Sequence, residues 1–431
     1  MSDGAFHFDA KQRSAAVLGQ YLWKLRQVLK EIWVRVLGYG AIAVLAALVS
    51  PSLAPYVPEN LRFDPGDGAV EEVLQIIASS MLAVTTFSLS IAVQAYAAAA
   101  TSATPRSTAL LQQDTTTQNV LATFLGAFLF SLMAIIGLEA GLYSDDGKFL
   151  LFVSTVLVVA TVVLALLRWI SHLINFGRMN DTLDRVEQAA TQAIKTRVAA
   201  PFLGATPRLG AIPPDARAVY PAQVGYVQHV DVAGLDKLAE EMDIEVWISE
   251  PAGKFVHPSI PILYVTGTRL DEEQMATVRQ GVTIGRERNF DQDPRFGLIV
   301  LSEIALRALS PAVNDPGTAI DVISRQARVL SLWKPEQPDE PDCKRVHMPP
   351  ISGQNMIDDA FHALTRDGAA FVEVQIRLHI ALKALAKNNA EVFEPAATAL
   401  ADLSVQRCTD AGMCDDDITR LRKHADLTHL L

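Results

Sequence analysis

The sequence predicts an α-helical multi-pass membrane domain followed by an α+β domain that has a small β-rich module and a helical C-terminal bundle. Four long apolar segments lie within the first 175 residues. No later segment is apolar for long enough to cross a hydrocarbon core about 30 Å thick. The hydrophobic fraction of 50% also suits a chain that is part membrane-embedded and part soluble.

Each apolar segment has the length of a membrane-spanning helix. The segments cover residues 36–57, 73–100, 120–138 and 149–167. A helix rises about 1.5 Å per residue, so roughly 20 residues cross the hydrocarbon core. Open strands are excluded there, because unpaired backbone groups cannot face lipid. We therefore predict a four-helix transmembrane domain over residues 36–175.

Lysine and arginine are concentrated on one side of these spans. The basic amphipathic N-terminal arm, residues 1–35, and the segment after the fourth span are rich in them, whereas the loops 58–72 and 139–148 carry only Arg62 and Lys148. Cytoplasmic loops have an excess of Lys and Arg. Both termini are therefore expected in the cytoplasm.

The second span carries a stripe of polar residues at helical spacings of three and four, which places them on one face. This polar stripe consists of Gln75, Ser79, Thr86, Ser90 and Gln94. It either lines an aqueous path or hydrogen-bonds neighbouring helices. The span contains no Asp, Glu, Lys or Arg, so a proton-coupled mechanism lacks its usual intramembrane carboxylate.

Two arginines are expected at the membrane surface. Arg106 follows Pro105, which ends the second helix, and Arg168 follows the fourth span. Contact with lipid phosphate is the expected role of Arg106. Arg168, with Trp169 and His172, is expected to anchor the fourth span at the membrane surface. Arg106 has two alternatives, which are to cap helix carbonyls or to pair with Asp114.

The second half of the chain divides by pattern into five regions. Residues 176–222 form a connecting helix and a Pro-rich linker, with no regular structure expected over 201–221. Residues 223–285 form the small β-rich module, with a helix over 232–242 between two strands. Residues 286–333 form a helix pair joined by the SPAVNDPGTA turn, residues 334–353 a Pro-rich spacer, and residues 354–431 the helical C-terminal region.

The helix pair has two interpretations. Asp315 followed by Pro316 is typical of an N-cap and first helical residue, which predicts a tight turn and a second helix through Leu330. A helix N-terminus beside arginines could also hold a phosphate or carboxylate. The residues of this predicted anion or structural site are Arg286, Arg288, Arg307, Asn314, Asp315 and Thr318.

Composition and motifs exclude several classes of function. The net charge of −11 argues against nucleic acid as a partner. The three cysteines have no CxxC spacing, so no structural zinc is expected. Motifs of known hydrolases, metalloproteases and nucleotide-dependent enzymes are missing from the soluble half. We predict no catalytic residue, metal or cofactor, and an enzyme is the least favoured reading.

Three stretches of the chain resemble a known family. They are TTFSLSIAVQAYAAAATSATPRSTALLQQD, LATFLGAFLFSL and GRERNFDQDPRFGLIVLSEIALRALSPAVNDPGTAIDVI. Together they resemble the uncharacterised bacterial membrane proteins known as domain of unknown function 2254. The resemblance implies a multi-pass protein of the bacterial inner membrane and supplies no reaction.

Two functions from different classes follow. The first is a homo-oligomeric channel or transporter, with the polar stripe facing a central path and the cytoplasmic domain acting as a gate. The second is a non-conducting, membrane-anchored ligand-binding or scaffolding protein. The expected partners are the lipid bilayer, further copies of the chain and a small anionic ligand.

Overall fold

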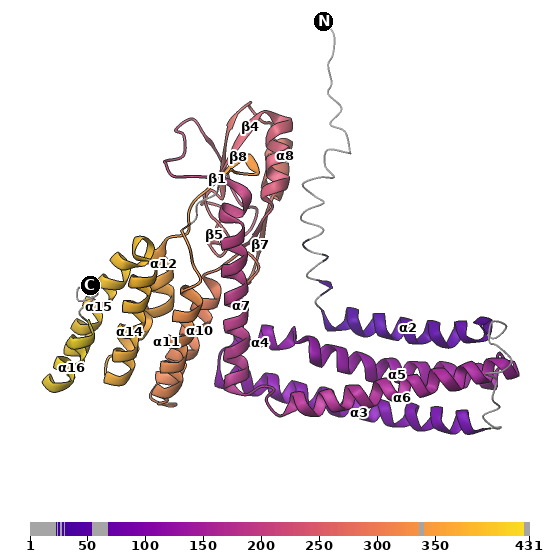
Figure 1. Ribbon diagram of the computed structural model, residues 1–431. Coiled ribbons are helices and arrows are strands. Elements are labelled where there is room, and N and C mark those ends of the chain that lie inside the picture. Colours follow the sequence, from indigo (N-terminus) through magenta and orange to yellow (C-terminus); the bar gives the residue numbers. More distant parts are fainter. Residues whose placement is uncertain are drawn as a thin grey trace, which may run out of the picture. The chain divides into compact units, whose positions relative to one another are not determined.

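The structure is a computed structural model (Figure 1), and it describes residues 23, 25, 28, 29, 31–53, 68–335 and 340–425. Most of the predicted N-terminal arm, the loop 54–67 with the end of the first predicted span, and the last six residues lie outside the described residues. The chain divides into two compact units. One covers Leu25–Thr182, and the other combines Met1–Lys24 with Leu183–Leu431.

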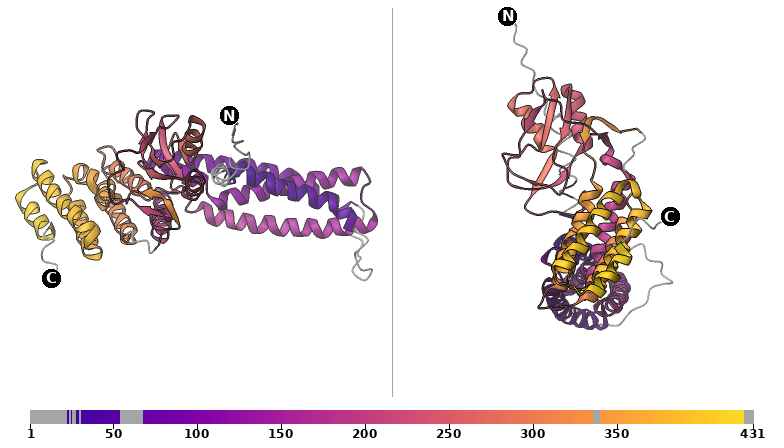
Figure 2. Two further views of the ribbon diagram at one scale, coloured as in Figure 1. Left: turned by 90° about the horizontal axis from the view of Figure 1, so that it is seen from above. Right: turned by 90° about the vertical axis from the view of Figure 1, so that its left-hand side faces the viewer.

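The first unit is entirely helical in its described residues. Its helices are α2 (Ile32–Leu53), α3 (Ala69–Ser102), α4 (Pro105–Gln112), α5 (Thr115–Glu139) and α6 (Asp145–Leu173). The four long helices run side by side, and α5 packs against α2, α3 and α6 (Figures 1 and 2). Gly40 in α2 lets α5 approach closely, because a Cβ there would lie only 2.9 Å from Leu129 Cδ1.

Three of the described helices are long and apolar enough to cross a membrane. They are α3, α5 and residues Gly147–Leu173 of α6. These agree with the second, third and fourth predicted spans. The described apolar part of α2, Trp33–Ala46, is shorter, so the first span stays a prediction, as does the cytoplasmic location of the termini.

The second unit contains two sheets. In the first, the strand order is β1 (Ala205–Pro207), β8 (Cys343–Met348), β4 (Ile244–Ile248), β6 (Leu263–Gly267) and β2 (Arg217–Val219). Strands β1, β8 and β4 are mutually parallel, whereas β6 and β2 are antiparallel additions. The second sheet is antiparallel, with β3 (Gly225–Val230) between β5 (Phe255–Val256) and β7 (Val282–Gly285).

The prediction that residues 201–221 lack regular structure is wrong. They form a short helical turn, η3 (Pro201–Gly204), and the strands β1 and β2. The predicted Pro-rich spacer likewise contains β8, which lies between β1 and β4. Proline has no backbone N–H and is tolerated at strand ends and sheet edges. The prolines therefore flank or end these short strands without preventing them.

Helices surround the sheets and continue beyond them. Helix α7 (Met179–Ala199) leads into the unit, α8 (Val232–Met242) has the predicted bounds, and α9 (Glu272–Gln280) precedes β7. A helical region follows (Figure 1). Its elements are α10 (Phe296–Leu309), α11 (Pro316–Leu330), α12 (Gly353–Ile357), η4 (Asp358–His362), α13 (Ala363–Asp367), α14 (Val372–Asn388), α15 (Ala390–Asp410) and α16 (Asp415–Ala425).

The predicted start of α11 is confirmed. The Asp315 carboxylate accepts hydrogen bonds from the Thr318 backbone N–H at 3.1 Å and from its hydroxyl at 2.6 Å. Pro316 is the first helical residue, where its missing N–H would have no helical partner. Helix α11 ends at Leu330, as the sequence predicts.

Candidate functional site

A cavity of about 430 Å³ lies in the second unit, where the three parallel strands end. Arg208 follows β1, Ser249 and Glu250 follow β4, and Met348 ends β8. Ligands of open α/β sheets bind outside the carboxyl ends of the strands, because the loops there diverge and leave a crevice. The topology therefore places this cavity where a binding site is expected.

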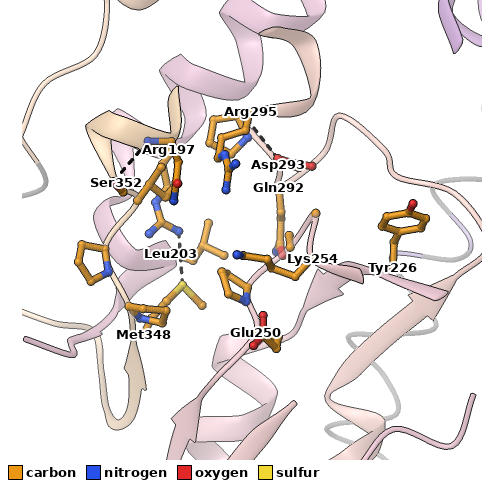
Figure 3. A pocket seen from close by; sticks show the side chains of 18 of the residues that line it. Arg197, Leu203, Tyr226, Glu250, Lys254, Gln292, Asp293, Arg295, Met348 and Ser352 are labelled. Atoms are coloured by element: carbon orange, nitrogen blue, oxygen red, sulfur yellow. Dashed lines mark hydrogen bonds between the residues drawn. The ribbon is translucent and has the colours of Figure 1, made fainter. Parts of the chain in front are cut away.

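Positive charge dominates the lining. Five basic side chains line the cavity, against the two carboxylates of Glu250 and Asp293. The basic residues are Arg197, Arg208, Lys254, Arg288 and Arg295. We call this site the cationic cavity (Figure 3).

Asp293 organises one wall of the cationic cavity. Its side chain is buried, and Oδ2 accepts hydrogen bonds from Arg288 Nε at 2.8 Å and Nη2 at 2.7 Å. Oδ1 accepts the Arg295 backbone N–H at 3.1 Å. The Arg295 side chain then donates to Asp359 of η4 at 2.6 Å. Two of the five cations are thus fixed by carboxylates, which holds the loop 288–295 in one conformation.

Another part of the lining contains Arg208, Lys254 and Glu250. Arg208 Nε is buried and has no hydrogen-bond partner among the residues that the structure describes. Burial raises the pKa of the Glu250 carboxyl, and the positive charges of Lys254 and Arg208 oppose that rise. A buried donor without an acceptor costs about 1–3 kcal/mol. An anionic group from outside would supply the missing acceptor.

Unusual backbone conformations shape the same cavity. Phe202 and Leu203 have φ values of 53° and 56°, a left-handed conformation that non-glycine residues adopt at a cost of about 1–3 kcal/mol each. They turn the chain from α7 into β1 and bring Leu203 into the lining. Gly253 has a φ of 89°, and a Cβ there would collide with the Asp293 carboxylate. The 251–254 turn therefore closes directly on Asp293.

Arg197 enters the cationic cavity from the end of α7. Its guanidinium is buried, lies 5.7 Å from the Phe202 ring centroid and donates to Met348 Sδ at 3.4 Å.

The structure divides the predicted anion or structural site into two groups. Arg288 lines the cationic cavity from the loop before α10, and Arg286 precedes it at an exposed position. Arg307, Asn314, Asp315 and Thr318 lie at the other end of α10, where Asn314 has a φ of 51° in the exposed turn. The 14 residues of α10 separate the groups by roughly 20 Å at 1.5 Å per residue.

The sequence did not single out the other four cations of the cavity. They come from α7, from the end of β1, from the turn after β4 and from the loop before α10. The only sequence signal was Arg295, which lies in the same conspicuous segment as Arg286 and Arg288. Within the described part of the chain, no group of three or more His, Cys, Asp or Glu residues is placed to hold a metal ion.

In the first unit, Leu25–Thr182, the polar stripe of α3 faces away from the other helices of the chain. Gln75, Ser79, Thr86, Ser90 and Gln94 are all exposed. The buried residues of α3 are Val70, Leu74, Ile77, Met81, Ser88, Ala92 and Ala99. At 100° per residue the two sets point in opposite directions. Packing within the chain therefore does not account for the stripe.

The stripe satisfies only part of its own hydrogen-bonding capacity. The Ser79 and Thr86 hydroxyls donate to carbonyls one turn earlier, at 2.9 and 3.2 Å. Gln94 Nε2 donates to Ser90 Oγ at 3.3 Å. A carboxamide has two N–H donors and an acceptor oxygen, so one long bond leaves most of its capacity unused.

The predicted surface arginines, Arg106 and Arg168, are both exposed. Asp114 caps α5 by accepting the Thr117 backbone N–H at 2.7 Å, and its carboxylate lies 2.9 Å from His172 Nε2 of α6. This pair joins the ends of α5 and α6. Contact of Arg106 with lipid phosphate and anchoring by Arg168 at the membrane surface stay predictions.

Comparison with known proteins supplies the family. A family model described as a predicted membrane protein (DUF2254) matches residues 30–384. Uncharacterized proteins of Mycobacterium bovis and Mycobacterium tuberculosis are 28% identical over 309 residues, which is 69% of this chain and 58% of each relative. No solved structure matches the chain. The chain spans about three fifths of these relatives, and by the family match it belongs to the DUF2254 predicted membrane proteins.

Proposed function

We propose that this chain is a membrane-anchored binding protein whose C-terminal half takes up a small anionic ligand in the cationic cavity. One observation carries the proposal, namely the five basic side chains at the carboxyl ends of three parallel strands. Buried cations are normally paired, because desolvating a charge is costly. The Arg208 Nε donor, which lacks an acceptor among the described residues, supports an anion as the missing partner.

The test is calorimetric titration of the full chain, in detergent or nanodiscs, with ribose 5-phosphate, inorganic phosphate and citrate. Arg208→Met and Lys254→Gln should each weaken binding of the anion about tenfold or more, since a hydrogen bond to a charged group contributes about 1.5–3 kcal/mol. Lys237→Gln is the matched control, because Lys237 is exposed on α8 and does not line the cavity.

A second readout separates ligand binding from a purely structural role for Arg208. Arg208→Met removes a buried donor that lacks an acceptor, so the ligand-free protein should be as stable as the parent or more so. A structural arginine would instead lower the unfolding temperature. Failure of all three anions to bind at millimolar concentration contradicts the proposal.

A second candidate function concerns the membrane unit. We propose that copies of the chain assemble through the polar stripe of α3 and that the assembly conducts an ion or small solute. Its support is the exposed position of all five stripe residues opposite the buried face of the helix. Amide groups that face lipid with unused hydrogen-bonding capacity are unfavourable, so a second copy of the chain or water is the expected neighbour.

Native mass spectrometry and liposome flux test this second function. Gln94→Leu should weaken the assembly and reduce flux, whereas Leu157→Ala on the exposed face of α6 should change neither. A monomer in native lipids contradicts both assembly and conduction. A stable oligomer without flux under any ion gradient or voltage contradicts conduction alone.

A further inference from the structure

The cationic cavity is larger than an inorganic anion requires. Its volume is about 430 Å³. That volume falls in the range of pockets that hold organic ligands, about 300–1,000 Å³. The occupant therefore has a substantial part besides its anionic group.

The two ends of the cavity differ in chemistry. In the view of Figure 3, Arg197 and Ser352 lie at one end and Tyr226 lies at the other, with Lys254 between them. Tyr226 meets Phe255 edge to face, with ring centroids 5.5 Å apart. Phe255 is 54% exposed although it is a large apolar side chain. The aromatic end thus offers a ring face that the protein itself leaves uncovered.

Between the two ends lies Glu250, a carboxylate from the turn after β4. Its oxygens can accept hydrogen bonds from hydroxyl groups, whereas Asp293 is already bonded to Arg288 and to the Arg295 backbone. Gln292 is also committed, because its amide exchanges two hydrogen bonds with the Val230 backbone at 2.8 and 3.2 Å. Glu250 is therefore the side chain suited to hydroxyls in the middle of a ligand.

We infer that the ligand is a nucleoside phosphate. This inference rests on the proposed anion binding and adds the identity of the ligand's other end. The phosphate lies among Arg197, Arg208 and Lys254, the sugar hydroxyls donate to Glu250, and the base stacks on the Tyr226–Phe255 pair. Stacking of a base on an aromatic ring is tolerant of base identity, since every base has a π face.

The test is competition calorimetry on the full chain with the 5′-monophosphates of adenosine, guanosine, cytidine and uridine, with ribose 5-phosphate as reference. We expect at least one nucleotide to bind about tenfold more tightly than ribose 5-phosphate. Phe255→Ala should remove that advantage and leave ribose 5-phosphate binding unchanged. Tyr220→Ala is the matched control, because Tyr220 is 45% exposed and does not line the cavity.

The outcomes separate the two proposals. If ribose 5-phosphate binds and no nucleotide exceeds it, or if Phe255→Ala affects both ligands equally, the nucleoside assignment is overturned and anion binding stands. If no phosphate compound binds, the nucleoside assignment and the proposed anion binding are both contradicted. The unfolding temperature shows whether Phe255→Ala is folded. If it is not, Phe255→Leu is used in its place, because leucine keeps an apolar side chain but has no ring.

Discussion

The Trp23 indole stacks on the His229 imidazole, with ring centroids 5.4 Å apart and 15° between the planes. Trp23 Nε1 also donates to Asp291 Oδ2 at 3.0 Å. Asp291 lies in the loop that supplies Arg288, Asp293 and Arg295 to the cationic cavity. Nine residues after Trp23, α2 begins. Trp23 is therefore held against a wall of the binding site by a ring stack and a hydrogen bond.

Trp23→Ala should loosen that wall. Losing one hydrogen bond and one ring stack removes about 1–2 kcal/mol, so local opening of the loop should become about tenfold more frequent. The measurement is the rate of trypsin cleavage after Arg286 or Arg288 in the folded protein. Trp23→Phe keeps an aromatic ring, so its cleavage rate should lie between those of Trp23→Ala and the parent. Equal cleavage rates in Trp23→Ala and the parent would show that the contact does not restrain the loop.

The sequence predicted elements whose signals are local. Asp315 and Pro316 identify the start of α11, because an N-cap and its hydrogen bonds involve only the first four residues of a helix. Residues 232–242 keep the apolar spacing of a helix over their whole length. Strand β1 was missed because it has only three residues, and β8 because it lies in a Pro-rich segment; pairing with each other and with β4 makes them strands. These pairs join residues 100 or more positions apart, so no local pattern in the sequence shows them.

The candidate site was predictable only in part for the same reason. Arg288 stood out because it lies in a segment dense in charge, but Arg208 and Lys254 are isolated basic residues in the sequence, and Arg197 has only Lys195 near it. Arg208 and Lys254 meet because β1 and β4 end at one edge of the sheet, and Arg197 reaches the same cavity from the end of α7. The polar stripe was visible as a helical face, whereas its direction away from the bundle needed the packing of α3 against α5.

Gly253→Ala should damage both stability and binding. The residue has a φ of 89°, and the added Cβ would collide with the Asp293 carboxylate. Strain and displacement of Asp293 together should cost about 2–4 kcal/mol and weaken anion binding. Differential scanning fluorimetry and calorimetry measure the two effects. Gly210→Ala is the control, because no heavy atom lies within 4 Å of its added Cβ. An unchanged unfolding temperature in Gly253→Ala contradicts the expectation.

Arg325→Met should destabilise the second unit more than any single surface charge removal. Arg325 is buried and donates to Asp184 at 2.6 Å, Glu187 at 2.7 Å and Asp321 at 2.8 Å, which joins α11 to α7. Removing it leaves three carboxylates facing one another, a loss of about 3 kcal/mol. Arg328→Gln removes an exposed guanidinium bonded to Glu187 and should cost about 0.5 kcal/mol. Urea unfolding of the two variants should therefore differ clearly, and similar midpoints would refute the anchoring role.

A buried histidine predicts how stability depends on pH. The Ser404 hydroxyl donates to Gln375 Oε1 at 2.7 Å, so His379 Nε2 must donate to Ser404 Oγ at 3.0 Å. The other ring nitrogen, Nδ1, is buried and has no hydrogen-bond partner among the described residues. Protonation there would bury an uncompensated charge. Burial, together with the nearby His424, accordingly lowers the pKa of His379 to about 4.

The folded protein therefore favours neutral His379, while the unfolded chain titrates near pH 6.5. The free energy of unfolding is therefore highest above pH 6.5 and decreases as the pH falls toward 4. Between pH 7.5 and pH 5 it should decrease by about 2 kcal/mol. Unfolding temperatures measured over that range should fall less steeply for His379→Gln than for the parent. His424→Gln removes the neighbouring charge without touching the buried network, so it should reduce the slope slightly. Parallel pH profiles for the parent and His379→Gln would show that His379 is already protonated or solvated in the folded protein.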